Sequence, residues 1–387
     1  MNVFEKDKTF ISGTYARFPV EIVKGKGSLF YDAEGKEYVD MGSGIAVNIF
    51  GFCDEELIAA VTEQLHKFQH TSNLYYQKPC VDLAEKLCEM TGMKKVFFSN
   101  SGAEANECAI KTARKYAEVK KGREYYNIIT LNNSFHGRTI TTLAATGQDV
   151  FHNDFTPLTE GFLYADANDA DGVTKLIDEN KVAALMFETV QGEGGVMPLS
   201  AEFVKSVTDY AQKKDVLIIC DEVQTGNGRT GKLYGYMHYG IKPDIVTTAK
   251  GLAGGLPLGA TMFGDKTADV LKAGMHGSTF GGNPVASAGA LSVLKRIDDK
   301  LMREVTEKSE YIKAALLKMK GVKSVSGTGL MLGVETVVPA REAVLRCMEN
   351  GAVFLTAKNK IRILPALNIS YELIDRALSV LKKVLEG

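Results

Sequence analysis

The chain has 387 residues, 45% of them hydrophobic and 24% charged, which is the composition of a globular protein with a large core. Its 46 Lys and Arg residues nearly balance 47 Asp and Glu residues, and a net charge of −1 argues against nucleic acid or a membrane surface as partner. We therefore expect small-molecule partners and, since no leader or membrane-spanning run is evident, a cytoplasmic location.

Neither the cysteines nor the histidines form a recognisable metal or disulfide pattern. The six cysteines show no CxxC spacing, so we expect reduced and mostly buried thiols. The six histidines form no HxxxH or HxH pair, and the sequence predicts no metal site.

In chain order, the first elements are hairpin strands with tight turns at Gly25 to Gly27 and at Asp32 to Gly35. From about Lys95 to Gly264, short apolar runs alternate with amphipathic stretches, which is typical of a mainly parallel sheet covered by helices. We expect helices at Ala103–Ala117 and Ala201–Lys213 and strands at Val96–Ser99, Asn127–Leu131, Val182–Glu188, Val216–Glu222, Asp244–Thr248 and Leu258–Gly264.

A second, smaller α+β unit is predicted to begin near Asp298 and to be joined by the N-terminal residues. The predicted division is residues 1–50 for the N-terminal segment, 51–297 for the large α/β domain and 298–387 for the small domain. Within the last part we expect a charged helix to Lys320, a strand at Val322–Glu335, a helix from Arg341 and a terminal helix at Tyr371–Leu385.

Two predicted strands end on residues of opposite charge. The apolar strand from Val216 ends on Asp221, before Gln224 and a glycine, and the next strand ends on Lys250 in glycine-rich surroundings. In a parallel α/β sheet, ligands bind outside the carboxyl ends of the strands. An isolated strand that ends on Asp favours a solvated loop or a helix cap, but the lysine that follows changes that interpretation.

A site for pyridoxal 5′-phosphate explains both strand ends. The cofactor requires an amine for its aldehyde and an anion opposite its ring nitrogen. Lys250 would carry it as a Schiff base, and Asp221 would keep the nitrogen protonated because a nearby negative charge favours the cationic form. Once substrate frees it, the amine of Lys250 can move a proton during catalysis.

Two further loops suit the phosphate and the substrate. Ser101, Gly102 and Ala103 lie between a strand and a helix, where free N–H groups bind anions, although simple helix capping explains them equally well. Phe135 and Arg138 follow the next strand and offer a ring for stacking and a guanidinium for a carboxylate. Taken singly, a phenylalanine is more often core and an arginine more often a surface charge.

Two polar loops complete the set. Glu188 and Glu193 follow a third strand, and Glu193 could mask a cationic substrate group or an arginine. The run from His276 to Pro284 is either a polar loop beside a phosphate or a helix-capping turn.

Together these residues resemble the class III (ornithine-type) aminotransferases, from Tyr15 to the C-terminus. Six ordered motifs carry the resemblance. They are Ser101 to Glu107, Phe135 to Thr139, Glu188 with Gln191 to Gly195, Asp221 to Gly226 with Gly228 to Gly231, Lys250 to Leu252, and Ser278 to Pro284.

The resemblance implies the type I fold of pyridoxal-phosphate enzymes, with a seven-stranded, mainly parallel sheet and a smaller α+β domain. It also implies a homodimer with shared active sites, in which Thr279 reaches the phosphate of the neighbouring subunit's cofactor. The other implied roles are phosphate binding by Ser101, Gly102 and Ala103, stacking by Phe135, contact of Gln224 with the phenolic oxygen, and substrate binding by Tyr15, Arg138, Ser278, Glu193 and Arg362, the last two pairing with each other.

Substrate choice depends on Gly44, where ornithine-specific members of the family have a tyrosine. The small residue leaves room for an acylated side chain and favours amino transfer between N²-acetylornithine and 2-oxoglutarate, as in arginine biosynthesis. Gly51-Phe52 and Pro365-Ala366 depart from the family's Gly-His and Pro-Pro. The alternatives are succinylornithine, succinyldiaminopimelate, ornithine or 4-aminobutyrate as amino donor, an aminomutase or racemase, and a catalytically inactive ligand-binding protein.

Overall fold

A seven-stranded sheet forms the centre of the computed structural model, which describes all 387 residues. β12 runs antiparallel to both of its neighbours, and the other neighbouring pairs are parallel, which confirms the predicted mainly parallel sheet. The strands, in spatial order, are β4 (Lys95–Ser99), β12 (Gly259–Phe263), β11 (Ile245–Thr248), β10 (Leu217–Asp221), β7 (Val182–Phe187), β5 (Asn127–Leu131) and β6 (Phe162–Ala165).

Helices cover both faces of this sheet because its strands are apolar on both sides. In β10, Leu217 and Ile219 pack in one cluster with side chains of α5 (Gly102–Lys120), whereas Ile218 and Cys220 pack in another with α8 (Ala201–Lys213). This alternation is the period of two that a strand imposes on its side chains. Both helices confirm the sequence prediction, and α5 is longer than expected at each end.

Two sequence predictions need correction. β6 (Phe162–Ala165) was not predicted, because it is a four-residue edge strand and two of its residues, Phe162 and Leu163, are only half-buried. The single strand expected at Val322–Glu335 is a hairpin of β13 (Val322–Thr328) and β14 (Met331–Thr336). The chain turns at Gly329, whose φ of 56° favours glycine and whose Cβ would lie 2.5 Å from the Arg229 carbonyl oxygen.

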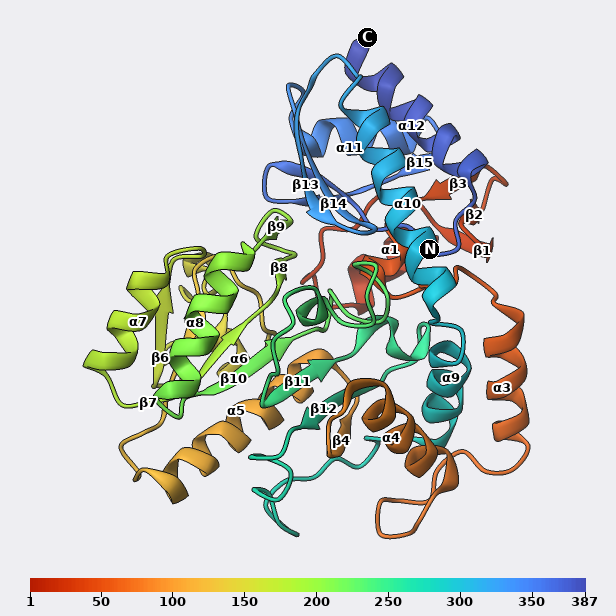
Figure 1. Cartoon of the computed structure of the whole chain (residues 1–387). Coiled ribbons are helices and arrows are strands. Elements are labelled where there is room, and N and C mark those ends of the chain that lie inside the picture. The colour runs from red at the N-terminus through yellow and green to blue at the C-terminus, as the bar shows by residue number, and fades with distance from the viewer.

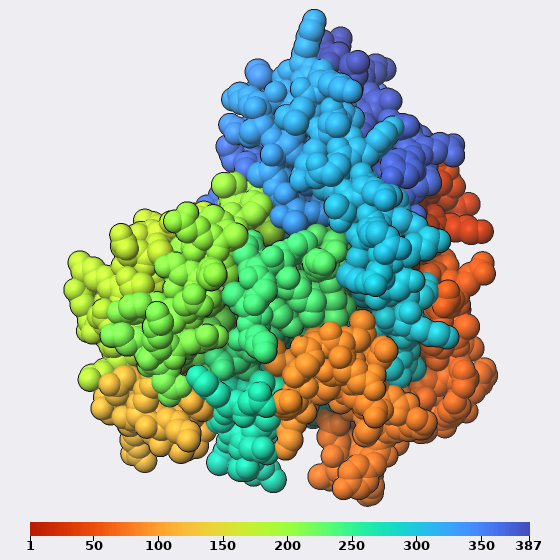
Figure 2. Space-filling model, in the orientation of Figure 1, coloured from red at the N-terminus to blue at the C-terminus, as the bar shows by residue number.

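The C-terminal part forms its own sheet, in the order β13-β14-β17-β16, against three helices. β16 is Leu355–Ala357 and β17 is Lys360–Ile363. The helices are α10 (Asp299–Leu316), α11 (Ala340–Glu349) and α12 (Tyr371–Glu386), so each expected helix is present with slightly different bounds. Figure 1 shows this blue part standing above the large sheet, and Figure 2 shows it as a separate lobe of the surface.

The N-terminal hairpins join the C-terminal part through a second four-stranded sheet. β1 (Ile22–Lys26), β2 (Leu29–Asp32) and β3 (Glu37–Asp40) form a meander with turns where they were expected. β3 then pairs in parallel with β15 (Ala352–Val353). The domain division at residues 50 and 297 stays a prediction.

The remaining elements surround these sheets. None of the helices combines the length and apolar composition that a bilayer crossing requires. Three of the six cysteines are buried, two are half-buried and Cys53 is exposed, and none is paired with another. The other elements are α1 (Val3–Phe10), α2 (Ser43–Ala46), α3 (Glu55–Leu65), α4 (Lys78–Thr91), α6 (Ile140–Ala145), η1 (Asp149–Phe151), α7 (Ala170–Glu179), β8 (Val190–Gln191), β9 (Met197–Pro198), η2 (Gly235–His238), η3 (Lys250–Ala253) and α9 (Pro284–Leu294).

Candidate active site

A cavity of about 400 Å³ lies at the carboxyl edge of the large sheet. Four neighbouring strands deliver residues to it: Phe135 follows β5, Glu188 follows β7, Asp221 ends β10 and Lys250 follows β11. Among the predicted site residues, the lining includes Ser101, Gly102, Ala103, Phe135, Arg138, Asp221, Gln224 and Lys250. Residues far apart in sequence meet here because parallel strands end at one edge of a sheet.

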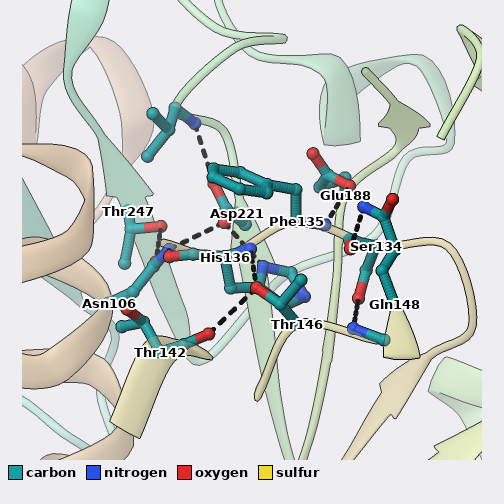
Figure 3. Close-up of polar contacts among 12 residues, drawn as sticks. Asn106, Ser134, Phe135, His136, Thr142, Thr146, Gln148, Glu188, Asp221 and Thr247 are labelled. Carbon is teal, nitrogen blue, oxygen red and sulfur yellow. Dashed lines mark hydrogen bonds and ion pairs between the residues drawn. The ribbon is translucent and has the colours of Figure 1, made fainter. Parts of the chain in front are cut away.

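Asp221 is held in place by three hydrogen bonds. Its Oδ2 accepts hydrogen bonds from Asn106 Nδ2 at 2.8 Å and from His136 Nδ1 at 2.7 Å (Figure 3). Its Oδ1 accepts the backbone N–H of Val223 at 3.0 Å. The carboxyl is only 3% exposed, and its hydrogen-bond partners all donate to it. Asp221 is therefore an anchored carboxylate that pairs with no Lys or Arg side chain.

Thr247 supports Asp221 indirectly, through Asn106. Asn106 Oδ1 accepts a hydrogen bond from Thr247 Oγ1 at 2.7 Å, which fixes the orientation of the Asn106 amide (Figure 3). Thr247 lies on β11, beside Asp221 in the register of the two strands. Sequence reasoning gave no role to Asn106 or to His136, although Asn106 follows Gly102 by one helical turn and therefore shares its face of α5.

Lys250 combines a strained backbone with a depressed pKa. Its φ of 42° lies in the left-handed region, which costs a residue other than glycine about 1–2 kcal/mol. Burial lowers the pKa of its amine, while the charge of Glu193 opposes the shift, Arg362 adds to it, and Asp221 and Glu188 oppose it more weakly. A larger share of the amine is consequently neutral near neutral pH than for a surface lysine.

The N-terminus of α5 faces the same cavity. The helix begins at Gly102, and Ser101 Oγ accepts the N–H of Glu104 at 3.2 Å, so Ser101 caps the helix and also lines the cavity. The N–H groups of the first turn have no helical partner. Gly102 is required here because a Cβ would lie 2.6 Å from Val223 Cγ1.

Arg362 and Glu193 form an ion pair beside the cavity. Arg362 Nη1 lies 2.5 Å from Glu193 Oε1 and 3.2 Å from Gln224 Oε1, and Gln224 lines the cavity. Arg362 is only 4% exposed. Burial raises the pKa of Glu193, but the Arg362 charge and hydrogen bond outweigh it and hold that pKa below its usual value of 4.5. Strand β17 of the C-terminal sheet thus brings a cation to the large sheet.

Phe135 and Arg138, in the loop after β5, take different positions in the cavity wall. Phe135 lines the cavity and its backbone N–H donates to Glu188 Oε2 at 3.2 Å. Arg138 lines the cavity from its exposed rim, with its guanidinium carbon 4.4 Å from the Phe151 ring centre and 5.6 Å from that of Phe135. Its guanidinium is free of any ion pair and can bind a carboxylate.

Besides Glu193 and Arg362, which lie beside the cavity, three further predicted residues do not line it in this chain. Ser278 accepts hydrogen bonds from Asn100 Nδ2 at 3.2 Å and from Gly281 N at 3.0 Å, so it lies one residue away from the lining. Thr279 is exposed, and Tyr15 is 72% exposed at the N-terminal surface. Within one chain, therefore, these side chains take no part in the cavity.

Comparisons with known proteins agree with this geometry. The family model described as "Aminotransferase class-III" matches residues 10–385. The chain is 48% identical over 381 residues to the acetylornithine aminotransferase of Haemophilus ducreyi, covering 98% of this chain and 97% of that protein. Among solved structures, the ornithine aminotransferase of Toxoplasma gondii ME49 superposes with a TM-score of 0.95 at 33% identity, covering 99% of this chain and 94% of that one. The N-acetylornithine aminotransferase of Stenotrophomonas maltophilia K279a gives 0.84 at 34% identity, covering 96% and 97%.

Glu193→Gln should destabilise the protein at neutral pH, because it leaves the buried Arg362 charge without an anion. We expect the free energy of unfolding, measured by urea denaturation, to fall by about 1–3 kcal/mol. The folded-state pKa of Glu193 is depressed, so its contribution is present above about pH 4.5 and is lost as the pH falls through the folded value. The difference in the free energy of unfolding between wild type and Glu193→Gln should accordingly become smaller in acid.

Glu63→Gln is the matched control for this measurement. Its side chain is 71% exposed and pairs only with Lys67 one helical turn away, so its loss should leave the free energy of unfolding nearly unchanged. Equal effects of the two substitutions at neutral pH would contradict a special role for the Glu193–Arg362 pair.

Proposed function

The chain belongs to the class III aminotransferases, and we propose that it transfers the distal amino group of N²-acetylornithine to 2-oxoglutarate with pyridoxal 5′-phosphate as cofactor. The observation that carries the proposal is the placement of an anchored carboxylate, Asp221, and an amine, Lys250, on the wall of one cavity. The high identity to an acetylornithine aminotransferase over nearly the full length supports the substrate.

The residues of the cavity fit the cofactor. Asp221 is a buried carboxylate that pairs with no Lys or Arg side chain, and a buried charge of this kind is stabilised by a cation such as a protonated ring nitrogen. The first turn of α5 offers unpaired N–H groups of Gly102 and Ala103 to a phosphate. Lys250 supplies the amine that the aldehyde requires, and Phe135 a ring for stacking.

The chain's own residues divide the chemistry between them. When bound, pyridoxal phosphate supplies a sink for the electron pair left on the carbon that bears the amino group. Asp221 sustains that sink by keeping the proton on the ring nitrogen. Lys250 Nζ, whose pKa burial lowers, would take the proton from the amine-bearing carbon and deliver it to the carbon of the cofactor that was its aldehyde. Gln224 is proposed to contact the phenolic oxygen.

Two arginines are proposed to bind the carboxylates. Arg138 would hold the α-carboxylate at the rim of the cavity. Arg362 would take the second carboxylate of 2-oxoglutarate, and Glu193 would neutralise Arg362 when an amino donor without that carboxylate is bound. One pocket could in this way accept both a basic and an acidic substrate.

We propose a homodimer in which the partner subunit completes the site. The exposed positions of Thr279 and Tyr15 support this, because family-matching residues that do not line the cavity of their own chain are free to reach that of a neighbour. Thr279 would bind the phosphate of the partner's cofactor, and Ser278 and Tyr15 would contact substrate.

The proposed acyl-group side of the pocket is a left-handed turn. Ser43, Gly44, Ile45 and Ala46 have φ values of 43°, 64°, 63° and 62°, and Val47 after them lines the cavity. The turn is held because Asp40 Oδ1 accepts the N–H groups of Gly42 and Ser43, at 2.8 and 2.9 Å. At Gly44, a Cβ would meet only Asn48 and Val47, at 3.4 and 3.7 Å, so the absent side chain leaves room beside the cavity.

A comparison of amino donors tests the proposed substrate. We expect N²-acetylornithine to bleach the visible absorbance of the purified holoenzyme faster than succinylornithine, succinyldiaminopimelate, ornithine or 4-aminobutyrate, in single-turnover mixing, and 2-oxoglutarate to restore it. Faster bleaching by another amine would replace the substrate and leave the reaction intact. No bleaching by any amine would remove the proposed reaction.

Lys250→Ala should abolish transamination, because no other amine in the cavity can accept the proton. We expect kcat to fall by about 100-fold or more, measured with N²-acetylornithine and 2-oxoglutarate. Lys232→Ala, which removes an exposed lysine, is the control and should leave kcat unchanged. Near-normal turnover of Lys250→Ala would refute its assigned role.

Gly44→Tyr should shift the preference among amino donors, since a bulky ring would fill the space proposed for the acetyl group. We expect kcat/KM for N²-acetylornithine to fall by about tenfold or more relative to that for ornithine. Gly44→Ala carries the same left-handed strain without the bulk, and should lower both values about equally. If Gly44→Tyr keeps the wild-type ratio of the two kcat/KM values, the acyl group does not bind beside residue 44.

A further inference from the structure

Glu188 is a buried carboxyl at the site to which the mechanism above assigns no task. It follows β7, is 5% exposed and lines the cavity. Its Oε2 accepts the backbone N–H of Phe135 at 3.2 Å (Figure 3). Its Oε1 has no hydrogen-bond partner within the chain. This atom is not fully buried, and it is open to the cavity that Glu188 lines.

The other carboxyls at the site have hydrogen-bond or ion-pair partners of their own. Asp221, on the neighbouring strand β10, is the anion held by His136, Asn106 and a backbone N–H. Glu193 pairs with Arg362 of β17. Neither Lys250 nor any other cation lies within ion-pair distance of Glu188, which is the one cavity-lining carboxyl besides Asp221.

A second anion next to Asp221 would be costly, since two carboxylates that share a buried wall repel each other. Burial raises the pKa of Glu188 well above 4.5, and the charge of Asp221 raises it further, whereas the Phe135 N–H and Lys250 oppose the shift. An ionised Glu188 would also raise the pKa of the Lys250 amine. Proton loss from Glu188 would thus work against the neutral lysine that the reaction requires.

We propose that Glu188 acts as a neutral carboxylic acid: its Oε2 holds the Phe135 backbone, and its protonated Oε1 donates a hydrogen bond into the cavity, to an oxygen of the bound cofactor. Asp221 is then the only anion on this wall, and its charge is directed to the ring nitrogen alone. Glu188 has two tasks, to position Phe135 and to keep Lys250 free of a second negative neighbour. The inference rests on the proposed cofactor, but not on the choice of amino donor.

Infrared difference spectroscopy tests the protonation state directly. The holoenzyme at neutral pH should show a protonated-carboxyl C=O band that shifts in D2O and is missing from Glu188→Gln. The band should fade as the pH is raised. If the spectra of wild type and Glu188→Gln differ only by a carboxylate band, Glu188 is ionised and the proposal fails.

Cofactor affinity, measured by equilibrium dialysis against pyridoxal phosphate, tests the donated hydrogen bond. Glu188→Gln keeps a neutral donor, whereas Glu188→Leu keeps the bulk without one, so we expect the Kd of Glu188→Leu to exceed that of Glu188→Gln by about tenfold. The wild-type Kd should rise from neutral to alkaline pH in a step that Glu188→Gln lacks. Equal Kd values for the two variants, or the same alkaline step in both wild type and Glu188→Gln, would overturn the proposal.

Both readouts are independent of turnover. A protein that binds pyridoxal phosphate yet transfers no amino group would contradict the proposed function and leave the assignment of Glu188 standing. Normal transamination by a protein whose Glu188 is ionised would refute the assignment of Glu188 and leave the proposed function standing.

Discussion

The site depends on one constraint, the placement of an ionised carboxylate in the interior at the end of a buried strand. Asp221 has almost no access to solvent, and an anion there is tolerated only because Asn106, His136 and a backbone N–H replace the lost water. No Lys or Arg side chain pairs with Asp221, so the chain places no permanent cation beside this carboxylate. A cationic ring nitrogen is the partner that such an arrangement favours.

Two further carboxyls at the site, Glu193 and Glu188, have neighbours that differ from those of Asp221. Glu193 is ionised because Arg362 neutralises it, and Glu188, which has no such partner, is the group that we propose to keep its proton. Lys250 lies among them with a depressed pKa. Three carboxyls of similar intrinsic acidity can in this way take separate roles within one site, because each has a different set of neighbours.

Two segments with strained backbone lie at the same place. Lys250 and the turn from Ser43 to Ala46 have positive φ values, which are unfavourable for side chains such as isoleucine and lysine. The surrounding hydrogen bonds of Asp40 and the packing of η3 hold these conformations. Strained residues on two different segments therefore flank the cavity, where they set the direction of the catalytic amine and the width of the pocket.

The sequence by itself determined the elements whose signal is local. Strands buried on both faces appear as apolar runs, so six strands of the large sheet could be placed, and the charges at two of their ends identified Asp221 and Lys250. The edge strand β6 and the hairpin at Gly329 were missed, since a short edge strand has little apolar signal and a turn inside an apolar run interrupts it by only a few residues.

Only the tertiary structure decided how the side chains meet. Asn106 and His136 belong to a helix and a loop that are distant from Asp221 in sequence, and nothing local shows that their donors converge on one oxygen. The same holds for the contact of Arg362 with Glu193, which joins two sheets, and for the isolation of Glu188 from any cation. The sequence specifies the type of each residue, but the charge state of a side chain depends on neighbours that only folding brings within a few ångströms.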